Sequence, residues 1–356
     1  MNDPQRTTNN FDFLRLLAAS LVVVGHSYWL CGRAADEPVR NFTAASDMAD
    51  IAVNLFFVMS GFLIATSWSN SRSTLEFAGK RALRIFPALI VSVLFAVLVV
   101  GPVATKLPLI EYLSDPQTYA YLANALLITE FHLPGVFAGN PFPDTVNGSL
   151  WTLPYEVGMY ASLMMLGLLR LFSGGIVLVL LAALIGIRFA LMPALEIESV
   201  LLSKATRLAL FFYAGCALYL YRDRIRWSWK LAVPLALLTI VTAGHQSWFL
   251  GHVLTLPYLV IYVAHLRLPL LAGAGKAGDF SYGLYIFSFP LQQLIMHWNP
   301  HLPLASFMIL SLALSLAAAV LSWHLIESPA LALKRYLPCG LKPPPIAVRA
   351  ANRSTR

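Results

Sequence analysis

Residues 11–30 read FDFLRLLAASLVVVGHSYWL, an apolar run of twenty residues that is interrupted by Asp12, Arg15 and His26. A helix of about 20 residues rises ~30 Å, which matches the hydrocarbon core of a bilayer. Nine further apolar blocks follow, at residues 51–68, 82–101, 150–172, 176–192, 201–221, 231–244, 248–264, 280–298 and 304–326. The sequence therefore predicts an all-α, polytopic bundle of about ten transmembrane helices.

The composition points to the same class of protein. Hydrophobic residues make up 58% of the chain and charged residues 12%, and the mean hydropathy is +0.69. A soluble domain carries about 25% charged residues, and a soluble helical core would need polar faces that these blocks lack. The net charge of +8 comes from short basic runs between apolar blocks. We therefore predict a lipid bilayer as the environment and no nucleic-acid partner.

The basic runs also predict a topology. They lie at residues 72–84, 222–230 and 334–342. With ten crossings, and with residues 119–131 taken as a short re-entrant or interfacial segment, all three runs fall on one side, which the positive-inside rule assigns to the cytoplasm. We expect a multi-pass protein of the cell inner membrane with both termini cytoplasmic. The first block, which carries Arg15, is expected to be a retained helix rather than a cleaved signal peptide.

The domain organisation follows from these blocks. Residues 1–10 form a cytoplasmic N-terminus, residues 11–330 the membrane domain, and residues 331–356 a basic cytoplasmic tail that we expect to be disordered. The three cysteines, Cys31, Cys216 and Cys339, lie in different segments without a C-x-x-C pair, so we expect neither a disulfide framework nor a metal site.

Two pairs of polar residues are candidates for chemistry. Arg15 and His26 are eleven positions apart, which places them on nearly the same helix face about 16 Å apart along the axis. An imidazole can act as a general base, although His26 could instead bond a neighbouring helix. Arg81 and Arg84 share a helix face and suit bidentate phosphate contacts, as in coenzyme A, or else simply contact lipid headgroups.

Several further polar and aromatic residues fall within or beside apolar blocks. An intramembrane carboxylate such as Glu156 calls for a function, for example to orient an imidazole. Asn54 is a buried amide in the second block, for which we expect a position within reach of His26. The candidates for contacts with a sugar or other substrate are Asn54, Trp151, Tyr155, Tyr282 and Tyr285.

Taken in order, these motifs resemble those of acyltransferase family 3, the integral-membrane acyltransferases that include O-antigen and exopolysaccharide O-acetylases. The shared motifs are Arg15 with ten residues before His26, the stretch 54–64, Arg81-x-x-Arg84, LWTLPYE at 150–156 and SYGLY at 281–285. The resemblance runs from residue 11 to about residue 329.

The resemblance implies an O-acyltransferase with acyl-CoA, usually acetyl-CoA, as a cytoplasmic co-substrate and with no tightly bound cofactor. The acceptor would be a hydroxyl of a glycan or lipid-linked sugar at the outer face, reached directly or through a separate extracytoplasmic transferase. By position, His26 is the essential histidine and Arg15 its motif partner, while Arg81 and Arg84 bind the donor. Many members carry an acidic residue in place of Asn54, which leaves Asp12, Asp50 and Glu156 as candidates to orient His26.

We therefore predict His26 and Glu156 as catalytic residues and Arg15, Arg81 and Arg84 as donor-binding residues, with no metal. His26 would act as general base or, alternatively, accept the acyl group first. The identity of the acceptor stays open, and the outward loops at residues 31–50 and 133–149 are expected to select it. An alternative function is a transporter or flippase of a glycan or lipid precursor, and a third is a non-catalytic membrane scaffold.

Overall fold

The computed structural model describes residues 10–266, 268, 273 and 275–338, and within these residues it is helical throughout apart from loops and one isolated β-bridge. The prediction of an all-α fold is confirmed. The helices of the first half are α1 (Phe11–Leu30), η2 (Ala34–Asp36), α2 (Pro38–Thr43), α3 (Met48–Asn70), α4 (Thr74–Phe95), η3 (Ala96–Val100), α5 (Gly101–Ala104), α6 (Leu109–Ser114), α7 (Pro116–Ala120), η4 (Tyr121–Leu126), η5 (Gly148–Thr152) and α8 (Leu153–Leu168). Those of the second half are α9 (Gly174–Gly186), η6 (Ile187–Leu191), α10 (Met192–Ala194), α11 (Val200–Leu220), α12 (Trp229–Thr242), α13 (Trp248–His265), α15 (Ser281–Trp298), α16 (Leu304–Ser322), η7 (Trp323–Glu327), α17 (Ser328–Ala332) and η8 (Leu333–Tyr336).

Seven helical segments in the described part of the chain are long and apolar enough to cross a membrane. They are Phe11–Leu30, Met48–Asn70, Thr74–Ala104, Gly174–Ala194, Val200–Leu220, Trp248–His265 and Leu304–Tyr336. Of the other three predicted crossings, α8 has 16 residues, α12 has 14, and α15 buries two glutamines within its apolar length. The protein is thus a multi-pass membrane bundle, while the number of ten crossings and the side of the termini stay predictions.

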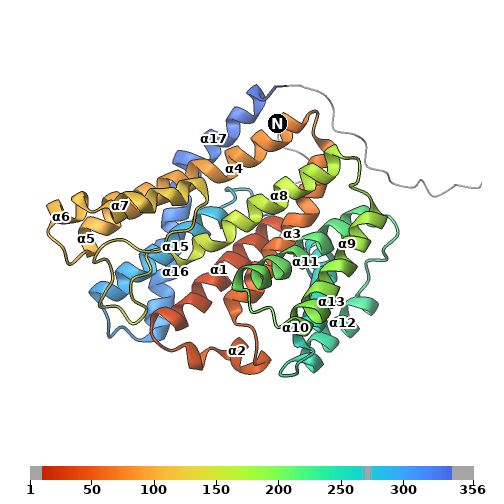
Figure 1. The fold of residues 1–356 in the computed structure, drawn as a ribbon, viewed down its shortest axis with the longest axis horizontal. Helices are drawn as coiled ribbons and strands as arrows, with labels where there is room; N and C mark the ends of the chain where they lie inside the picture. The colour runs from red at the N-terminus through yellow and green to blue at the C-terminus, as the bar shows by residue number, and fades with distance from the viewer. Residues whose placement is uncertain (1–9, 267, 269–272, 274, 339–356) are drawn as a thin grey trace, which may run out of the picture.

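The centre of the bundle is formed by five helices. α1 packs between α3 and α15, α3 packs against α11, and α15 packs against α16 (Figure 1). The closest approach joins α3 to α11, because a Cβ atom on Gly61 or Gly215 would overlap a backbone carbonyl of the facing helix. Small residues permit this spacing in membrane bundles, where packing rather than the hydrophobic effect holds helices together.

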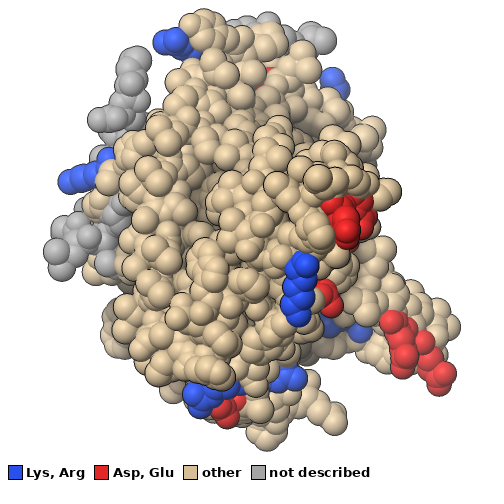
Figure 2. All heavy atoms as spheres, turned by 90° about the vertical axis from the view of Figure 1, so that its left-hand side faces the viewer, with Lys and Arg blue, Asp and Glu red and all other residues tan. Residues whose placement is uncertain are grey.

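The outer helices turn apolar side chains outward. Only 11% of the apolar window in Gly174–Ala194 is buried inside the protein, compared with 61% for α3. Ile309 of α16 and Val179 of α9 are both more than half exposed. One face of the molecule shows few Lys, Arg, Asp or Glu side chains, and these are scattered (Figure 2). Such a surface suits contact with lipid rather than water.

The predicted re-entrant segment at residues 119–131 does not form a membrane-length helix, in agreement with the prediction. The chain runs through α7 and η4 and leaves the helical conformation at Leu127, whose φ is 65°. The segment that follows is fixed to α15. Asn140 Nδ2 donates to the Gln293 carbonyl at 3.0 Å, and Gln293 Nε2 donates to the Phe142 and Thr145 carbonyls, each at 2.8 Å.

The predicted boundary of the membrane domain at residue 330 stays a prediction, and the structure shows that the chain beyond it is still packed on the bundle. The helix continues through α17 and η8 to Tyr336, and Ser73 Oγ at the start of α4 donates to the Pro338 carbonyl at 3.0 Å. Leu337 packs against Gly79 of α4, so an apolar side chain keeps this part of the chain on the bundle. Residues 1–9 and 339–356, which include Cys339 and Lys342, lie outside the described residues.

Candidate active site

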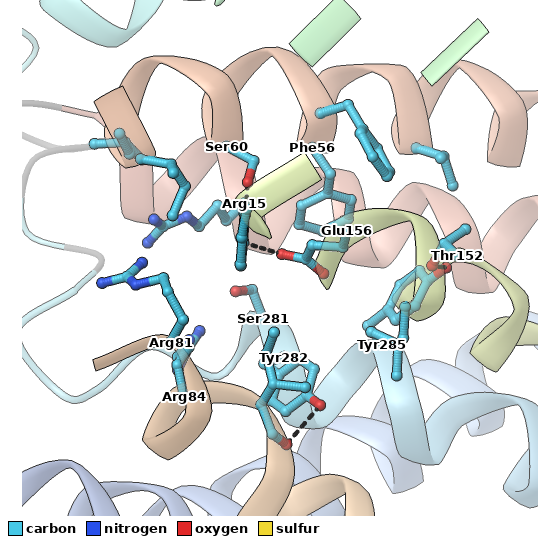
Figure 3. Close-up of a pocket in the computed structure, with 17 residues that line it drawn as sticks. Arg15, Phe56, Ser60, Arg81, Arg84, Thr152, Glu156, Ser281, Tyr282 and Tyr285 are labelled. Atoms are coloured by element: carbon cyan, nitrogen blue, oxygen red, sulfur yellow. Dashed lines mark hydrogen bonds between the residues drawn. The ribbon is translucent and has the colours of Figure 1, made fainter. Parts of the chain in front are cut away.

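A narrow cavity of about 110 Å³, which we call the arginine pocket, lies among α1, α3, α4, α8 and α15. Arg15, Arg81 and Arg84 line one end of it, and their guanidinium groups face a common space (Figure 3). Thr152 and Tyr285 line the other end, with Glu156 between the two ends. The three arginines that the sequence singled out therefore come together in one pocket.

Buried carboxylates hold two of these three arginines. Asp279 Oδ2 lies 3.1 Å from Arg15 Nη1 and 2.7 Å from Arg84 Nη2, and Glu327 Oε2 lies 3.1 Å from Arg84 Nη1. Burial raises the pKa of the Asp279 carboxyl, but the Arg84 and Arg15 guanidinium groups and the hydrogen bonds from Ser281 outweigh burial and hold that pKa well below its usual range. Arg15 and Arg84 are thus both fixed by Asp279, a carboxylate that stays charged, and Arg84 also contacts Glu327.

Arg81 lacks such a partner. Among the residues that the structure describes, none places a carboxylate oxygen within 4.0 Å of it, and its Nε is buried without a hydrogen-bond acceptor. Because an uncompensated cation in a bundle core is costly, a cation left open in a pocket indicates an anionic ligand.

Glu156 lies in the first turn of α8, inside the arginine pocket. Its carboxylate accepts a hydrogen bond from the Tyr160 hydroxyl one turn further along, and that hydroxyl also contacts Ser60 Oγ of α3 at 3.0 Å. None of its contacts among the described residues reaches His26. The structure therefore separates the two residues that we predicted to work together.

A larger cavity of about 660 Å³, which we call the histidine pocket, opens at the other end of the same helices. His26 of α1 lines it, with its ring edge-on to Phe289 at 5.1 Å between centroids. His26 Nδ1 is buried and has no hydrogen-bond partner among the described residues. Because Nδ1 is closed off from the cavity, a proton exchanged with a substrate in the pocket would pass through Nε2.

Asp50 and Asp47 both line the histidine pocket, and Asp50 interacts electrostatically with His26. Of the other candidates to orient His26, Asp12 pairs with Arg15 at 3.3 Å and Glu156 lies in the arginine pocket. Asp50 itself lies 2.5 Å from Arg207 Nη1. The geometry thus favours Asp50 among the three candidates.

The two pockets share two residues, Val53 of α3 and Tyr285 of α15. Tyr285 donates its hydroxyl hydrogen to the Ser149 carbonyl at 3.0 Å, and its oxygen lies 2.7 Å from Thr152 Oγ1. The pockets therefore meet at a junction formed by one aliphatic side chain and one anchored tyrosine.

The predicted substrate-contact residues divide between these places. Trp151 lines the histidine pocket, Tyr282 the arginine pocket, and Tyr285 both. Asn54 is buried and lines neither pocket, and Tyr155 packs against Trp151 at 5.7 Å without lining either. These last two positions are therefore better placed for packing than for contact with a substrate in either pocket.

The sequence missed the following charged residues that line the two pockets or pair with their arginines: Asp47, Arg188, Lys204, Arg207, Asp279 and Glu327. Asp279 was missed because it precedes its apolar block by one position, and no motif pointed to it. Arg188, Lys204 and Arg207 lie inside or beside apolar blocks and line the histidine pocket, so the cost of charge in a membrane should have drawn attention to them. No cluster of three or more His, Cys, Asp or Glu side chains able to hold a metal ion occurs in the described ranges.

Comparison with known proteins identifies the class. A family model described as an acyltransferase domain, that of acyltransferase family 3, matches residues 8–324, so the chain belongs to this family. The chain is 29% identical to an O-acetyl transferase of Shigella phage Sf6, over 90% of this chain and 95% of the relative. It is 31% identical to Nodulation protein 10 of Rhizobium leguminosarum bv. viciae, over 92% of this chain and 95% of the relative. No solved structure matches the chain.

Proposed function

We propose that this membrane acyltransferase moves an acetyl group from cytoplasmic acetyl-CoA to a hydroxyl group of a periplasmic or cell-surface glycan. Membership of acyltransferase family 3 supports group transfer, and the name of the phage relative supports O-acetylation. The observation that carries the proposal is the pair of pockets, one cationic and one with an unpartnered imidazole, that share Val53 and Tyr285.

In this proposal the chain crosses the inner membrane ten times and has both termini in the cytoplasm. The arginine pocket then lies toward the cytoplasm, where α1 and α15 begin, and the histidine pocket toward the outer face, where α1 ends. The basic runs at residues 72–84 and 222–230 support this orientation through the positive-inside rule.

Coenzyme A would bind with its phosphates at the cytoplasmic end. Arg81 would make the main phosphate contact because Arg15 and Arg84 already hold Asp279 and Glu327. The slender pantetheine arm would extend through the arginine pocket and bring the thioester past Val53 and Tyr285. The acyl carbon would then enter the histidine pocket without any movement of the whole donor across the membrane.

At the outer end, His26 would take the proton of the acceptor hydroxyl as that oxygen attacks the thioester carbonyl. The tetrahedral intermediate would collapse with cleavage of the C–S bond, and the imidazolium would return the proton to the departing thiolate. Asp50 would stabilise the imidazolium, and the Trp151 ring would offer a flat surface to the sugar. Acylation of His26 before transfer to the acceptor is the alternative order of steps.

A transporter or flippase would explain the membrane bundle but not the family match. It would also have no need to consume acyl-CoA, so donor consumption distinguishes the two functions.

The test uses cells that express the wild type, His26→Ala or the control His301→Ala, whose histidine is exposed and lines neither pocket. Radiolabelled acetyl-CoA is supplied to the cytoplasmic side of inverted membrane vesicles, and label is measured in the glycan fraction. We expect label with the wild type and with His301→Ala, and none above background with His26→Ala at equal protein abundance. Labelling by His26→Ala would remove His26 from the mechanism, and no labelling by any of the three proteins would contradict the proposed donor.

A further inference from the structure

Two cations line the wall of the histidine pocket without a carboxylate to neutralise them. They are Arg188, in the π-turn η6, and Lys204, near the start of α11. In the described part of the chain, no carboxylate oxygen lies within 4.0 Å of either charged group. Charged side chains in apolar helices are costly, so two of them facing one cavity require a reason.

Both cations are held in place by neutral partners. Arg188 Nη1 donates to the Ser203 carbonyl at 3.0 Å and to Ser203 Oγ at 2.8 Å, and its guanidinium lies 4.7 Å from the centre of the Phe249 ring. The Lys204 ammonium lies 4.3 Å from the centre of the Trp151 ring. Cation–π contacts and neutral acceptors position a charge without cancelling it.

The local backbone supports a functional role for Arg188. A π-turn inserts an extra residue into an α-helix and is often found at functional sites. The described residues contain two further π-turns: η7 ends at Glu327, which binds Arg84, and η3 carries no charged side chain. Arg188 itself lines the histidine pocket, whereas Glu327 reaches the arginine pocket only through its contact with Arg84.

The carboxylates that line the histidine pocket do not neutralise all of its cations. Asp50 is bound to Arg207, and it attracts Lys204 only at longer range. Asp47 accepts hydrogen bonds from the Trp29 indole at 3.0 Å and from the Asp50 amide at 2.7 Å, and the burial of its carboxyl and the charge of Asp50 raise its pKa. Arg207 repels both Arg188 and Lys204.

Two further carboxylates lie close to this wall. Glu196 and Glu198 line a neighbouring cavity together with Arg188 but do not pair with it. The wall formed by Arg188 and Lys204 therefore presents two positive charges to the histidine pocket.

We propose that Arg188 and Lys204 form an anion-binding subsite for the acceptor. It would bind an acidic group of the acceptor, a carboxylate or a phosphate, close to the hydroxyl that is acylated. The acidic group would sit between the guanidinium and the ammonium, while the sugar ring that carries it lies on Trp151. The cavity volume of about 660 Å³ falls in the range of small-molecule sites and accommodates a charged sugar residue. This subsite rests on the proposed function, because it names the class of acceptor that the same site takes.

The donor is not the occupant of this subsite. Its phosphates have their own cationic site in the arginine pocket, which Arg188 and Lys204 do not line. Both cations instead share a cavity with His26, where the acceptor hydroxyl must lie.

The test measures inhibition of acetyl transfer by small sugars. The purified protein in phosphatidylcholine nanodiscs transfers label from acetyl-CoA to the deacetylated glycan fraction of the envelope. Methyl glucuronide, glucose 1-phosphate and neutral methyl glucoside are added as competitors. For the wild type we expect an acidic sugar to inhibit at a concentration about tenfold or more below the neutral one, with competition against the glycan and not against acetyl-CoA. The more effective of the two acidic sugars identifies the acid as carboxylate or phosphate.

The variants are Lys204→Met, Arg188→Met and Lys204→Arg, with Lys106→Met as a matched loss of one charge at an exposed lysine that lines neither pocket. We expect the preference for acidic sugars to fall below about threefold in Lys204→Met and Arg188→Met and to persist in Lys204→Arg and Lys106→Met. The KM for acetyl-CoA should not change in any of them, which also reports that each variant is folded.

Equal inhibition by acidic and neutral sugars in the wild type would overturn the subsite. A preference for acidic over neutral sugars that persists in both Lys204→Met and Arg188→Met would also overturn it. A preference that is lost in phosphatidylglycerol nanodiscs but present in phosphatidylcholine would assign the cations to a lipid headgroup instead. Absence of any transfer by the wild type would contradict the proposed function, and with it the subsite, and is distinguished by the lack of labelled product before any competitor is added.

Discussion

The arginine pocket and the histidine pocket lie among the same central helices but neutralise their charges in different ways. In the arginine pocket, Asp279 and Glu327 fix two of three arginines, and the cavity is only about 110 Å³. In the histidine pocket, the cavity is about 660 Å³, and only Arg207 is paired with a carboxylate. The small arginine pocket, with most of its charges paired, suits a single ligand such as coenzyme A. The larger histidine pocket, with cations that no carboxylate neutralises, suits a ligand that carries its own negative charge.

The two pockets also differ in the kind of backbone that forms their walls. Every residue that lines the arginine pocket lies in a helix, whereas the histidine pocket also takes Asp47 from the turn before α3 and Phe131, Phe142 and Thr145 from the segment between η4 and η5. Loops tolerate sequence change better than packed helices do. We therefore expect the fold to fix the donor end and the connecting segments to set the acceptor end, and the selection of the acceptor by residues 31–50 and 133–149 stays a prediction.

The largest expected effect separates chemistry from donor binding. His26→Ala should lower kcat by about 10²–10⁴-fold, the range for removal of a general base, with the affinity for acetyl-CoA unchanged. The measurement is single-turnover transfer beside equilibrium binding of a non-hydrolysable acetyl-CoA analogue. If the variant lost binding and rate together, the two pockets would not be functionally distinct, and the division proposed here would be wrong.

The second-largest effect is expected in the arginine pocket, where the donor would bind. Arg81→Gln should raise the KM for acetyl-CoA by about 10–100-fold, because a charge-assisted contact with phosphate contributes ~1.5–3 kcal/mol. Acetyl-pantetheine, which has no phosphate, should be used equally well by the variant and the wild type. The exposed Arg33→Gln serves as the control, since Arg33 pairs with Asp36 on the surface and lines neither pocket. A similar loss with both donors would assign Arg81 to the fold rather than to the phosphates.

Much of this architecture could be predicted from the sequence because a bilayer imposes strong rules. The twenty-residue apolar blocks gave the helices, and the cost of intramembrane charge pointed to Arg15, His26, Arg81, Arg84 and Glu156, all of which line one of the two pockets. The motif spacing also led to the correct family.

What the sequence could not provide was the pairing between distant segments. Nothing local shows that Asp279 would reach back to Arg15 and Arg84, which lie 264 and 195 positions away. Helical periodicity likewise does not reveal that Glu156 faces the arginines instead of His26, because that depends on how α8 is rotated against α1 and α4. Asn54 is a similar case, because a buried polar residue can follow Val53, which lines both pockets, and still line neither of them.

A smaller effect is expected at the carboxylate beside His26. Asp50→Asn should lower kcat by about tenfold, or ~1.4 kcal/mol, with little change in the KM for acetyl-CoA, because an imidazolium that forms during transfer loses a nearby negative charge. Asp50→Glu should recover most of the rate.

The same substitution also leaves Arg207 without its partner, so a double variant is needed. Asp50→Asn combined with Arg207→Gln removes both charges of the pair. If the loss arises at His26, the double variant should remain as slow as Asp50→Asn. Full recovery in the double variant would show that an unpaired Arg207, and not the histidine, causes the defect.

The smallest effect tests the junction where the two pockets meet. Val53→Ala removes two methyl groups from the wall shared by both pockets, and a methylene in an apolar site contributes about 1–3 kcal/mol of discrimination between substrates. We expect the rate with propionyl-CoA relative to acetyl-CoA to rise about two- to fivefold, measured as the ratio of kcat/KM for the two donors. Val58→Ala is the matched control, because Val58 is buried on the same helix and lines neither pocket. An equal change in both variants would attribute the relaxed selectivity to looser packing of α3, whereas a change in Val53→Ala alone would show that the acyl group passes from one pocket to the other at this point.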